Sequence, residues 1–266
     1  MQARLLHASQ IGNIKAVKQI LIKAKESNVY EKVLHARNYA GYTPLHLAVV
    51  KTNKEVINHL LKNDFSANTY LNEIADTNDY KESGYQYEGM LKGRTPLMSA
   101  AISGDLSIVE KLVENKAEVD AVCDRSCTAV WYAAQNGSLQ ALRCLMKQPK
   151  NVREGTAKRK AERKGFQGRS PLGEAASRGE TSVVECLIEE FNVDKDHQED
   201  NGYTPLMRAV ENNHCKTAEY LLKAGADSTR KARNKKDADS IAIDNDNQHL
   251  MKLLGRKPNL LSCRLI

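Results

Sequence analysis

The fold of this chain is decided by the stretch Gly202-Tyr203-Thr204-Pro205-Leu206-Met207-Arg208-Ala209-Val210, because the same pattern recurs along the sequence. Close copies are Gly41-Tyr42-Thr43-Pro44-Leu45-His46-Leu47-Ala48-Val49 and Gly93-Arg94-Thr95-Pro96-Leu97-Met98-Ser99-Ala100-Ala101. A further copy, Gly168-Arg169-Ser170-Pro171-Leu172-Gly173-Glu174-Ala175-Ala176, has Ser in place of Thr, and Thr128-Ala129-Val130-Trp131-Tyr132-Ala133-Ala134 is a weaker copy. A single Thr-Pro-Leu would be a weak signal, but five copies in one frame predict a tandem repeat of one structural unit.

The residue types in the pattern predict a tight turn followed by a helix. Gly two places before Thr permits a backbone with positive φ, as a tight turn requires. Thr or Ser can cap the helix, and Pro at the first helical position gives up only an N–H group that would have no helical partner. Leu and the small Ala three residues later point to one face, so a second helix can approach that face closely.

A second helix is expected after each turn. The Thr or its equivalent falls at positions 43, 95, 128, 170 and 204. Apolar residues follow each of these positions at helical spacing, as Val56, Ile57, Leu60 and Leu61 do after Thr43. The template also extends over residues 3–25 and from Asp237 to Leu254. We therefore expect seven units, with degenerate units as caps at both ends.

The repeated motif resembles that of the ankyrin repeat family, whose signature is T-P-L-H-x-A on a period of about 33 residues. The resemblance covers nearly the whole chain except three insertions. It implies an all-α ankyrin-repeat solenoid, built of helix–turn–helix units with β-hairpin fingers. We expect a single ankyrin-repeat domain at residues 1–256, with insertions near 26–34, 70–91 and 148–166, and a C-terminal tail at 257–266.

Composition favours an intracellular globular protein. The chain has 266 residues, of which 41% are hydrophobic and only 5% aromatic, which suits an aliphatic core between short helices. No run approaches the roughly 18 apolar residues of a membrane span, and the N-terminus lacks the apolar region of a signal peptide. Six scattered Cys favour a reducing compartment. We expect a cytoplasmic monomer, in the host cytosol if it is a secreted effector, and the nucleus or a membrane surface is disfavoured.

The net charge of +7 comes from one segment. Residues 147–169 contain nine bases and two acids, a difference of seven, so the remainder of the chain is neutral. The segment includes a basic patch formed by Lys158, Arg159, Lys160, Arg163 and Lys164. It is either a solvated loop or a contact for an acidic protein, an anionic membrane or nucleic acid. Nucleic acid is disfavoured because Phe166 is the only aromatic residue near the patch.

No catalytic or metal-binding pattern is found in the sequence. None of the seven His has a metal-ligand spacing to another His or to a Cys. Cys123 and Cys127 are four residues apart but lack a second pair or a nearby His, which disfavours zinc. The sequence has no glycine-rich phosphate loop, no G-x-S-x-G and no H-E-x-x-H. We therefore expect neither an enzyme nor a cofactor.

The ankyrin resemblance implies that partners bind at the finger tips and at the exposed side of each first helix. The tip positions are Tyr39, Tyr42, Lys92, Arg94, Arg125, Phe166, Gln167, Arg169 and Tyr203. The first-helix positions include Ser99, Ile102, Trp131, Tyr132, Arg178, Arg208 and Glu211. Trp, Tyr and Arg are the residue types enriched at binding hot spots. Trp131 has two interpretations: it fills space left by a divergent motif, or it is exposed beside Arg94 and Arg169 as part of an interface.

The sequence thus favours a non-catalytic protein–protein interaction module, an adaptor or a secreted effector, that binds a protein partner. The alternative is a peripheral membrane or nucleic-acid binder that uses the basic insertion 148–166. In that alternative Cys263 is a candidate lipidation site, because Cys263-Arg264-Leu265-Ile266 resembles a C-a-a-X box, although Arg264 departs from the usual pattern.

Overall fold

The computed structural model describes residues 1–62, 93–147 and 164–255. The chain divides into two compact units: Met1–Ala133 with Gln140–Gln148, and Ala134–Leu139 with Pro149–Ile266. The predicted insertion at 70–91 and the tail at 257–266 lie outside the described residues, as does most of the insertion at 148–166. The extent of the domain, residues 1–256, stays a prediction.

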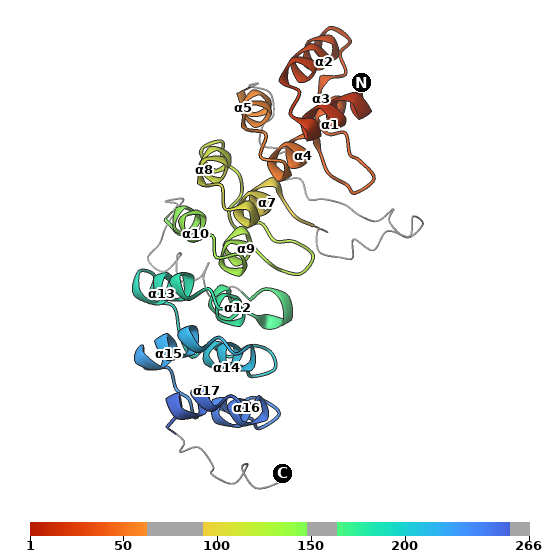
Figure 1. Cartoon of the computed structure of the whole chain (residues 1–266). Helices are drawn as coiled ribbons and strands as arrows, with labels where there is room; N and C mark the ends of the chain where they lie inside the picture. The colour runs from red at the N-terminus through yellow and green to blue at the C-terminus, as the bar shows by residue number, and fades with distance from the viewer. Residues whose placement is uncertain (63–92, 148–163, 256–266) are drawn as a thin grey trace, which may run out of the picture. The chain divides into compact units, whose positions relative to one another are not determined.

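The first unit is built from pairs of short helices. The first helices of its repeats are α1 (Gln2–Ile11), α4 (Pro44–Val50), α7 (Pro96–Ser103) and α9 (Ala129–Gln135), whose last two residues belong to the second unit. The second helices are α2 (Ile14–Glu26), α5 (Lys54–Lys62), α8 (Leu106–Glu114) and α10 (Leu139–Met146). Figure 1 shows α1, α4 and α7 in one row and α2, α5 and α8 in a second row. A short helix, α3 (Tyr30–Leu34), lies in the expected insertion near 26–34 and packs against α1 and α2.

The second unit repeats the same arrangement. Its first helices are α12 (Pro171–Arg178), α14 (Pro205–Glu211) and α16 (Ala238–Asp244), and its second helices are α13 (Thr181–Glu189), α15 (Cys215–Lys223) and α17 (Gln248–Leu253). In Figure 1, α14 lies between α12 and α16, while α13 contacts α15 and α15 contacts α17. A 3-10 turn, η2 (Phe166–Gly168), precedes α12.

The predicted all-α repeat fold is confirmed, since every regular element in the described ranges is helical. The expected β-hairpin fingers contain no β-strand there; each is a tight turn of a few residues. Such a turn makes too few backbone hydrogen bonds for a strand pair. The number of seven units stays a prediction.

The motif residues act as the sequence predicts. Thr43 and Thr204 precede α4 and α14, and each hydroxyl accepts a hydrogen bond at 3.3 Å from the backbone N–H three residues later. Equivalent caps are made by Thr95, Thr128, Ser170 and Asp237. Gly41 and Gly202 have φ values of 71° and 81°. The caps satisfy N–H groups that the helix itself leaves without partners, and so they fix where each first helix begins.

The core lies between the two rows of helices in each unit. The predicted apolar residues of α5 (Val56, Ile57, Leu60 and Leu61) are all buried. In α14, Leu206 and Ala209 are fully buried, and α14 packs against both α12 and α16. Protein interiors are close-packed, so a larger side chain at Ala209 is expected to disturb this packing.

Substitution Ala209→Glu should therefore lower the free energy of unfolding by more than about 3 kcal/mol, because it buries a charge without a partner. Urea denaturation followed by circular dichroism measures the loss. Gln248→Glu adds the same charge at an exposed position of α17 and should change stability by less than about 0.5 kcal/mol. Equal stability of the two variants would contradict the repeat register described above.

Candidate protein-interaction surface

Five segments that precede first helices share one backbone geometry. In each, the N–H of the first residue donates to the carbonyl of the fifth, and the N–H of the fourth donates to the carbonyl of the first, at distances of 2.8–3.0 Å. The segments are 38–42, 123–127, 165–169, 199–203 and 232–236. We call them finger turns. The two hydrogen bonds close each segment on itself, so its backbone is fixed without help from a sheet.

The fourth residue of each finger turn is left-handed. Gly168 and Gly202 hold this position with φ values of 72° and 81°, whereas Ser126 and Lys235 adopt it with φ values of 61° and 64°. A residue with a Cβ atom pays roughly 1–2 kcal/mol for that conformation. Gly202 is required for a second reason, because a Cβ there would lie 2.9 Å from the backbone nitrogen of Arg233. Neighbouring finger turns in the second unit are therefore in backbone contact.

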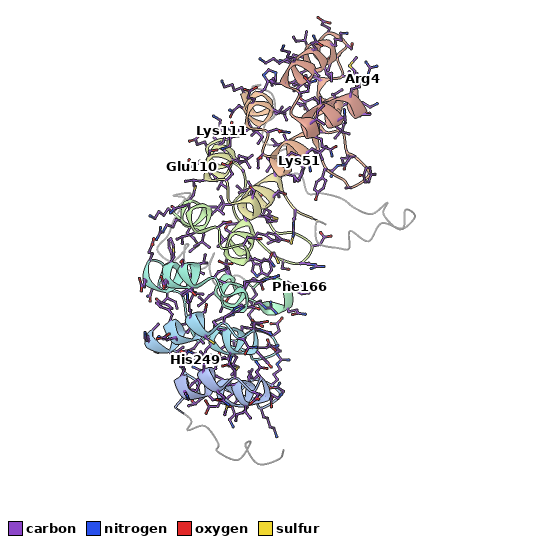
Figure 2. All side chains as sticks on the ribbon, in the orientation of Figure 1. Arg4, Lys51, Glu110, Lys111, Phe166 and His249 are labelled. Carbon is purple, nitrogen blue, oxygen red and sulfur yellow. The ribbon has the colours of Figure 1, made fainter. Side chains whose placement is uncertain are left out.

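All but one of the second and third residues of the finger turns are exposed; the exception, Ala40, is half-buried against a hydrophobic cluster. Tyr39 is 77% exposed, and Asp124, Arg125, Phe166, Gln167, Asp200, Asn201, Arg233 and Asn234 are also exposed. Figure 2 labels Phe166 on the turn that leads into α12. Two turns present an aromatic residue, one presents Asp and Arg, the next presents Asp and Asn, and the last presents Arg and Asn, although their backbones match. The finger turns thus present different side chains from one common framework.

Trp131 and Tyr132 are buried, so the expectation that they form an exposed binding patch is wrong. Only 4% of Trp131 and 3% of Tyr132 is exposed. Trp131 takes the position that His46 holds in α4, a fully buried slot where the imidazole contacts Thr43. The two rings of α9 meet edge to face, with centroids 5.3 Å apart. This packing supports the interpretation that Trp131 fills the space left by a divergent motif.

Tyr132 also holds Arg94 of the preceding repeat. The guanidinium carbon of Arg94 lies 4.3 Å from the centre of the Tyr132 ring, a cation–π contact. The Sγ atom of Cys123 lies 3.4 Å from the Tyr132 hydroxyl oxygen. Burial, together with the contact to Cys123, raises the pKa of Tyr132. Arg94 is half-buried, so its predicted exposure at a finger tip is only partial.

In the second unit, charged side chains form a buried ionic cluster of Arg169, Glu174, Glu199, Arg208 and Glu211. The Nη1 atom of Arg169 donates to Glu174 Oε2 at 2.7 Å, and its Nε atom lies 3.3 Å from Glu199 Oε1. The Nε atom of Arg208 donates to both oxygens of Glu199, at 3.1 and 3.0 Å, and its Nη2 atom pairs with Glu199 Oε2. Its Nη1 atom reaches Glu211 Oε2 at 2.7 Å. Each buried carboxylate is thus paired, as burial of a charge requires.

Gly173, which takes the position of the motif His, lies directly beside the ionic cluster. A Cβ atom at Gly173 would lie 3.1 Å from Glu199 Oε1 and 3.2 Å from the Cγ atom of Arg169. Glycine inside a helix costs roughly 1 kcal/mol relative to alanine. The absent side chain leaves the space in which the Glu199 carboxylate reaches Arg169. We interpret the loss of the motif His as coupled to this cluster.

Glu174 remains ionised inside the cluster. Burial alone would raise its pKa, but hydrogen bonds from Arg169, Gln135 and Arg178 outweigh that effect and lower it. The Nε2 atom of Gln135 donates to Glu174 Oε1 at 3.0 Å, and Arg178 Nε donates to the same oxygen at 3.1 Å. Three donors therefore stabilise one buried carboxylate.

The other predicted site residues are scattered over the described chain or lie outside it. Arg178 is exposed, and Tyr203 is half-buried with the Arg208 guanidinium carbon 4.4 Å from its ring centre. Tyr42 and Ser99 are buried, and Ile102 is half-buried. In the basic patch Lys164 is exposed and lies 3.3 Å from Asp200. Outside the described residues are Lys92, Lys158, Arg159, Lys160, Arg163 and Cys263.

The geometry defines a class of protein: a tandem helix-pair repeat that displays variable side chains on fixed turns. In the described ranges, no group of three His, Cys, Asp or Glu side chains is placed to hold a metal ion. A helix of the length and apolarity needed to cross a bilayer is also absent from that part of the chain.

The chain belongs to the ankyrin repeat family. The family model for three-copy ankyrin repeats matches residues 70–156 and 150–232, and the single-repeat model matches residues 40–73. Ankyrin repeats are generally protein-interaction modules rather than catalysts.

Several curated proteins are similar to this chain. The nuclear factor NF-kappa-B p105 subunit of Gallus gallus is 26% identical over 84% of this chain and 20% of its own length. Alpha-latrocrustotoxin-Lt1a of Latrodectus tredecimguttatus is 28% identical over 57% of this chain and 10% of its own. Inversin of Gallus gallus is 39% identical over 34% of this chain and 8% of its own. The chain therefore spans a fifth or less of these relatives.

Acid should weaken the ionic cluster. Because the folded-state pKa of Glu174 is lowered, its contribution to stability is present above its unfolded-state pKa and is lost as the pH falls through the folded value. We expect Glu174→Gln to flatten the fall in unfolding free energy between about pH 5 and pH 3. Glu110→Gln changes an exposed carboxylate on α8 and should keep the wild-type slope. Parallel curves for wild type and Glu174→Gln would contradict this role.

Trp131→Ala tests the burial of the indole. Removing a buried aromatic side chain should cost about 3–5 kcal/mol of stability, which thermal and urea denaturation can measure. Tyr39→Ala, at an exposed finger tip, should cost less than about 0.5 kcal/mol. A Trp131→Ala protein as stable as the wild type would contradict the burial of the indole.

Proposed function

We propose that this protein is a non-catalytic interaction module, an adaptor or an effector, that binds a partner protein through its finger turns. The proposal rests on one observation: the finger turns share one backbone geometry, whereas the side chains at their tips differ from turn to turn. The two hydrogen bonds of each finger turn need no particular side chain at the second and third residues. Those residues nevertheless include Tyr39, Arg125 and Arg233, and Tyr and Arg are residue types enriched at binding hot spots.

Rigid tips favour binding for an energetic reason. A flexible loop loses conformational freedom when it docks, and this loss subtracts from affinity. The closed backbone of each finger turn has already lost that freedom on folding. In this proposal the repeats serve as a scaffold, and the tips of each unit supply the contacts.

The chemistry of one tip favours an acidic partner. The finger turn 232–236 presents Arg233 and Lys235 to solvent, with Asn234 between them. It is flanked by Arg230 and Lys231, which are also exposed. Its backbone is tied to the preceding finger turn, since Arg233 N–H donates to the Asn201 carbonyl at 3.0 Å. Fixed cations of this kind attract a carboxylate-rich segment and accelerate its encounter.

The basic insertion 148–166 supports a second candidate function, contact with an anionic membrane or with nucleic acid. Its support is the concentration of the whole net charge in one segment of the sequence. A lipid on Cys263 would add a membrane anchor. We place the protein in the cytoplasm in either case, and protein binding remains the first proposal.

The test compares matched variants of the intact chain. The tip variant combines Tyr39→Ser, Phe166→Ser and Arg233→Ser, and the control is Ile22→Ser, an exposed apolar residue on the second helix α2. Proteins captured from cytosol by the wild type are identified, and their affinities for each variant are measured by calorimetry. We expect the tip variant to bind at least tenfold more weakly, about 1.4 kcal/mol, and the control to bind normally.

A tip variant with wild-type affinity and melting temperature would contradict the proposal. A third protein, with residues 148–166 deleted, separates the two candidate functions. Loss of binding to anionic vesicles or nucleic acid in this deletion, with no protein partner for the wild type, would favour the second candidate.

A further inference from the structure

The finger turn 123–127 has a thiol at both its first and its fifth residue. The other finger turns carry Asn38 and Tyr42, Gly165 and Arg169, Glu199 and Tyr203, and Ala232 and Lys236 at these positions. No other described finger turn therefore pairs two side chains that can react with one another. The spacing of the two cysteines in the sequence indicated only a weak zinc motif. The geometry of the turn indicates instead that the two thiols can react with one another.

The backbone brings the two cysteines to the spacing of a disulfide. The N–H of Cys123 donates to the carbonyl of Cys127 at 3.0 Å, so the residues face one another across the turn. The N–H of Ser126 also donates to the Cys123 carbonyl at 2.8 Å, so the turn is closed on itself. The side chains of Cys123 and Cys127 already interact in the reduced turn. A disulfide requires its two residues to be this near one another, with Cα separations of about 4.4–6.8 Å.

The surroundings of Cys123 favour its thiolate form, which is the reactive form of the thiol. The Cys127 side chain interacts with the Cys123 thiol, and the Tyr132 hydroxyl lies 3.4 Å from the Cys123 sulfur. The Cys127 thiol also donates to the Arg125 carbonyl at 3.5 Å. The Arg94 guanidinium stacks on the ring of that tyrosine. The interaction with Cys127 outweighs burial, and the pKa of Cys123 is lowered.

Burial limits which reagents can reach the pair. Only 5% of Cys123 and 1% of Cys127 is exposed, which excludes bulky disulfides and electrophiles from the folded turn. The three residues between them, Asp124, Arg125 and Ser126, are exposed, so the two thiols lie just below the surface of the turn. A molecule as small as hydrogen peroxide can reach them there. Zinc is a poor alternative because its structural sites need four ligands, and the described residues offer no group of three.

We propose that Cys123 and Cys127 form a reversible disulfide across this finger turn when a peroxide oxidises them. The Cys123 thiolate attacks one oxygen of hydrogen peroxide, the O–O bond breaks, and a sulfenic acid and hydroxide form. The Cys127 sulfur then attacks the sulfenic sulfur, the S–O bond breaks, and the leaving hydroxide takes the Cys127 proton as water. The two thiols are oxidised and the peroxide is reduced to two waters in total. A dithiol restores the starting state.

The disulfide would alter the display of Arg125. Formation of the disulfide removes the contact between the Cys123 thiol and the Tyr132 hydroxyl. It also replaces the non-covalent contact between the two cysteine side chains by a covalent bond. The tip residues between the cysteines are then held in a ring closed at both ends. Oxidation would thus change one finger turn and leave the others as they are.

The test uses the full-length folded chain and one equivalent of hydrogen peroxide. After the peroxide has been removed, the chain is unfolded in guanidinium so that all remaining thiols can be alkylated, and peptides are analysed by mass spectrometry. We expect the peptide that holds both cysteines to lose two hydrogen atoms and to escape alkylation. Cys144 and Cys215 are less buried than the pair and serve as internal controls. They should stay alkylated, and dithiothreitol should restore two alkylated thiols at the finger turn.

Two variants trace the order of the steps. Cys127→Ser should stop at the sulfenic acid of Cys123, which dimedone traps, whereas Cys123→Ser should lose the reaction completely. Cys127→Ala is the substitute if the serine variant does not fold. The proposal is overturned if Cys144 or Cys215 reacts before the pair, or if both finger cysteines remain fully alkylated after peroxide treatment.

Discussion

The hydrogen bond from the third helical N–H to the side chain of Thr, Ser or Asp is the interaction on which the described repeats from α4 onward depend. It fixes the residue at which a first helix begins, as at Thr43, and it does so in the same way at Asp237, where the motif has lost its Thr-Pro-Leu. The finger turn immediately before the cap then has a defined exit direction. Because the start of the helix and the turn before it are both fixed, the small Ala on the inner face, such as Ala209, is positioned for a neighbouring helix to pack against it. Local satisfaction of one backbone donor thus sets the register of the packing.

The ionic cluster of the second unit shows that the repeat backbone can hold charged residues in its interior in place of uncharged ones. A buried carboxylate is costly, and Glu199 is stabilised only because Arg208 and Arg169 both reach it. A Cβ atom at Gly173 would crowd the pair, and the loss of a side chain there weakens the helix. The first unit fills the same position with His46, Met98 or Trp131, and α14 of the second unit fills it with Met207. Repeats of one backbone therefore use several different interiors, and the choice depends on the residues of the neighbouring repeat rather than on the motif.

Much of the fold could be predicted because its determinants are local. Glycine before threonine, proline after it and apolar residues at helical spacing are all read within one repeat, and the structure has the helices where these patterns indicate. The site was less predictable because its determinants are not local. Arg169 and Glu199 are thirty residues apart in the sequence, and nothing in either motif indicates that they meet. The sequence left two interpretations of Trp131, because a large aromatic side chain in a divergent motif is equally consistent with packing and with binding. Only the volume between adjacent first helices decides between the two.

The separation between framework and tip explains why the finger turns are the part of the molecule that can acquire function. A substitution in a first helix has to fit two neighbours, so most changes there cost stability. A substitution at the second or third residue of a finger turn meets solvent and leaves both hydrogen bonds intact. The first and fifth residues are an intermediate case, since the backbone holds them opposite one another and their burial differs from turn to turn. At Cys123 and Cys127 the side chains are buried and held close together, yet they border an exposed tip. These two positions therefore link the packed interior of a repeat to the surface that it presents.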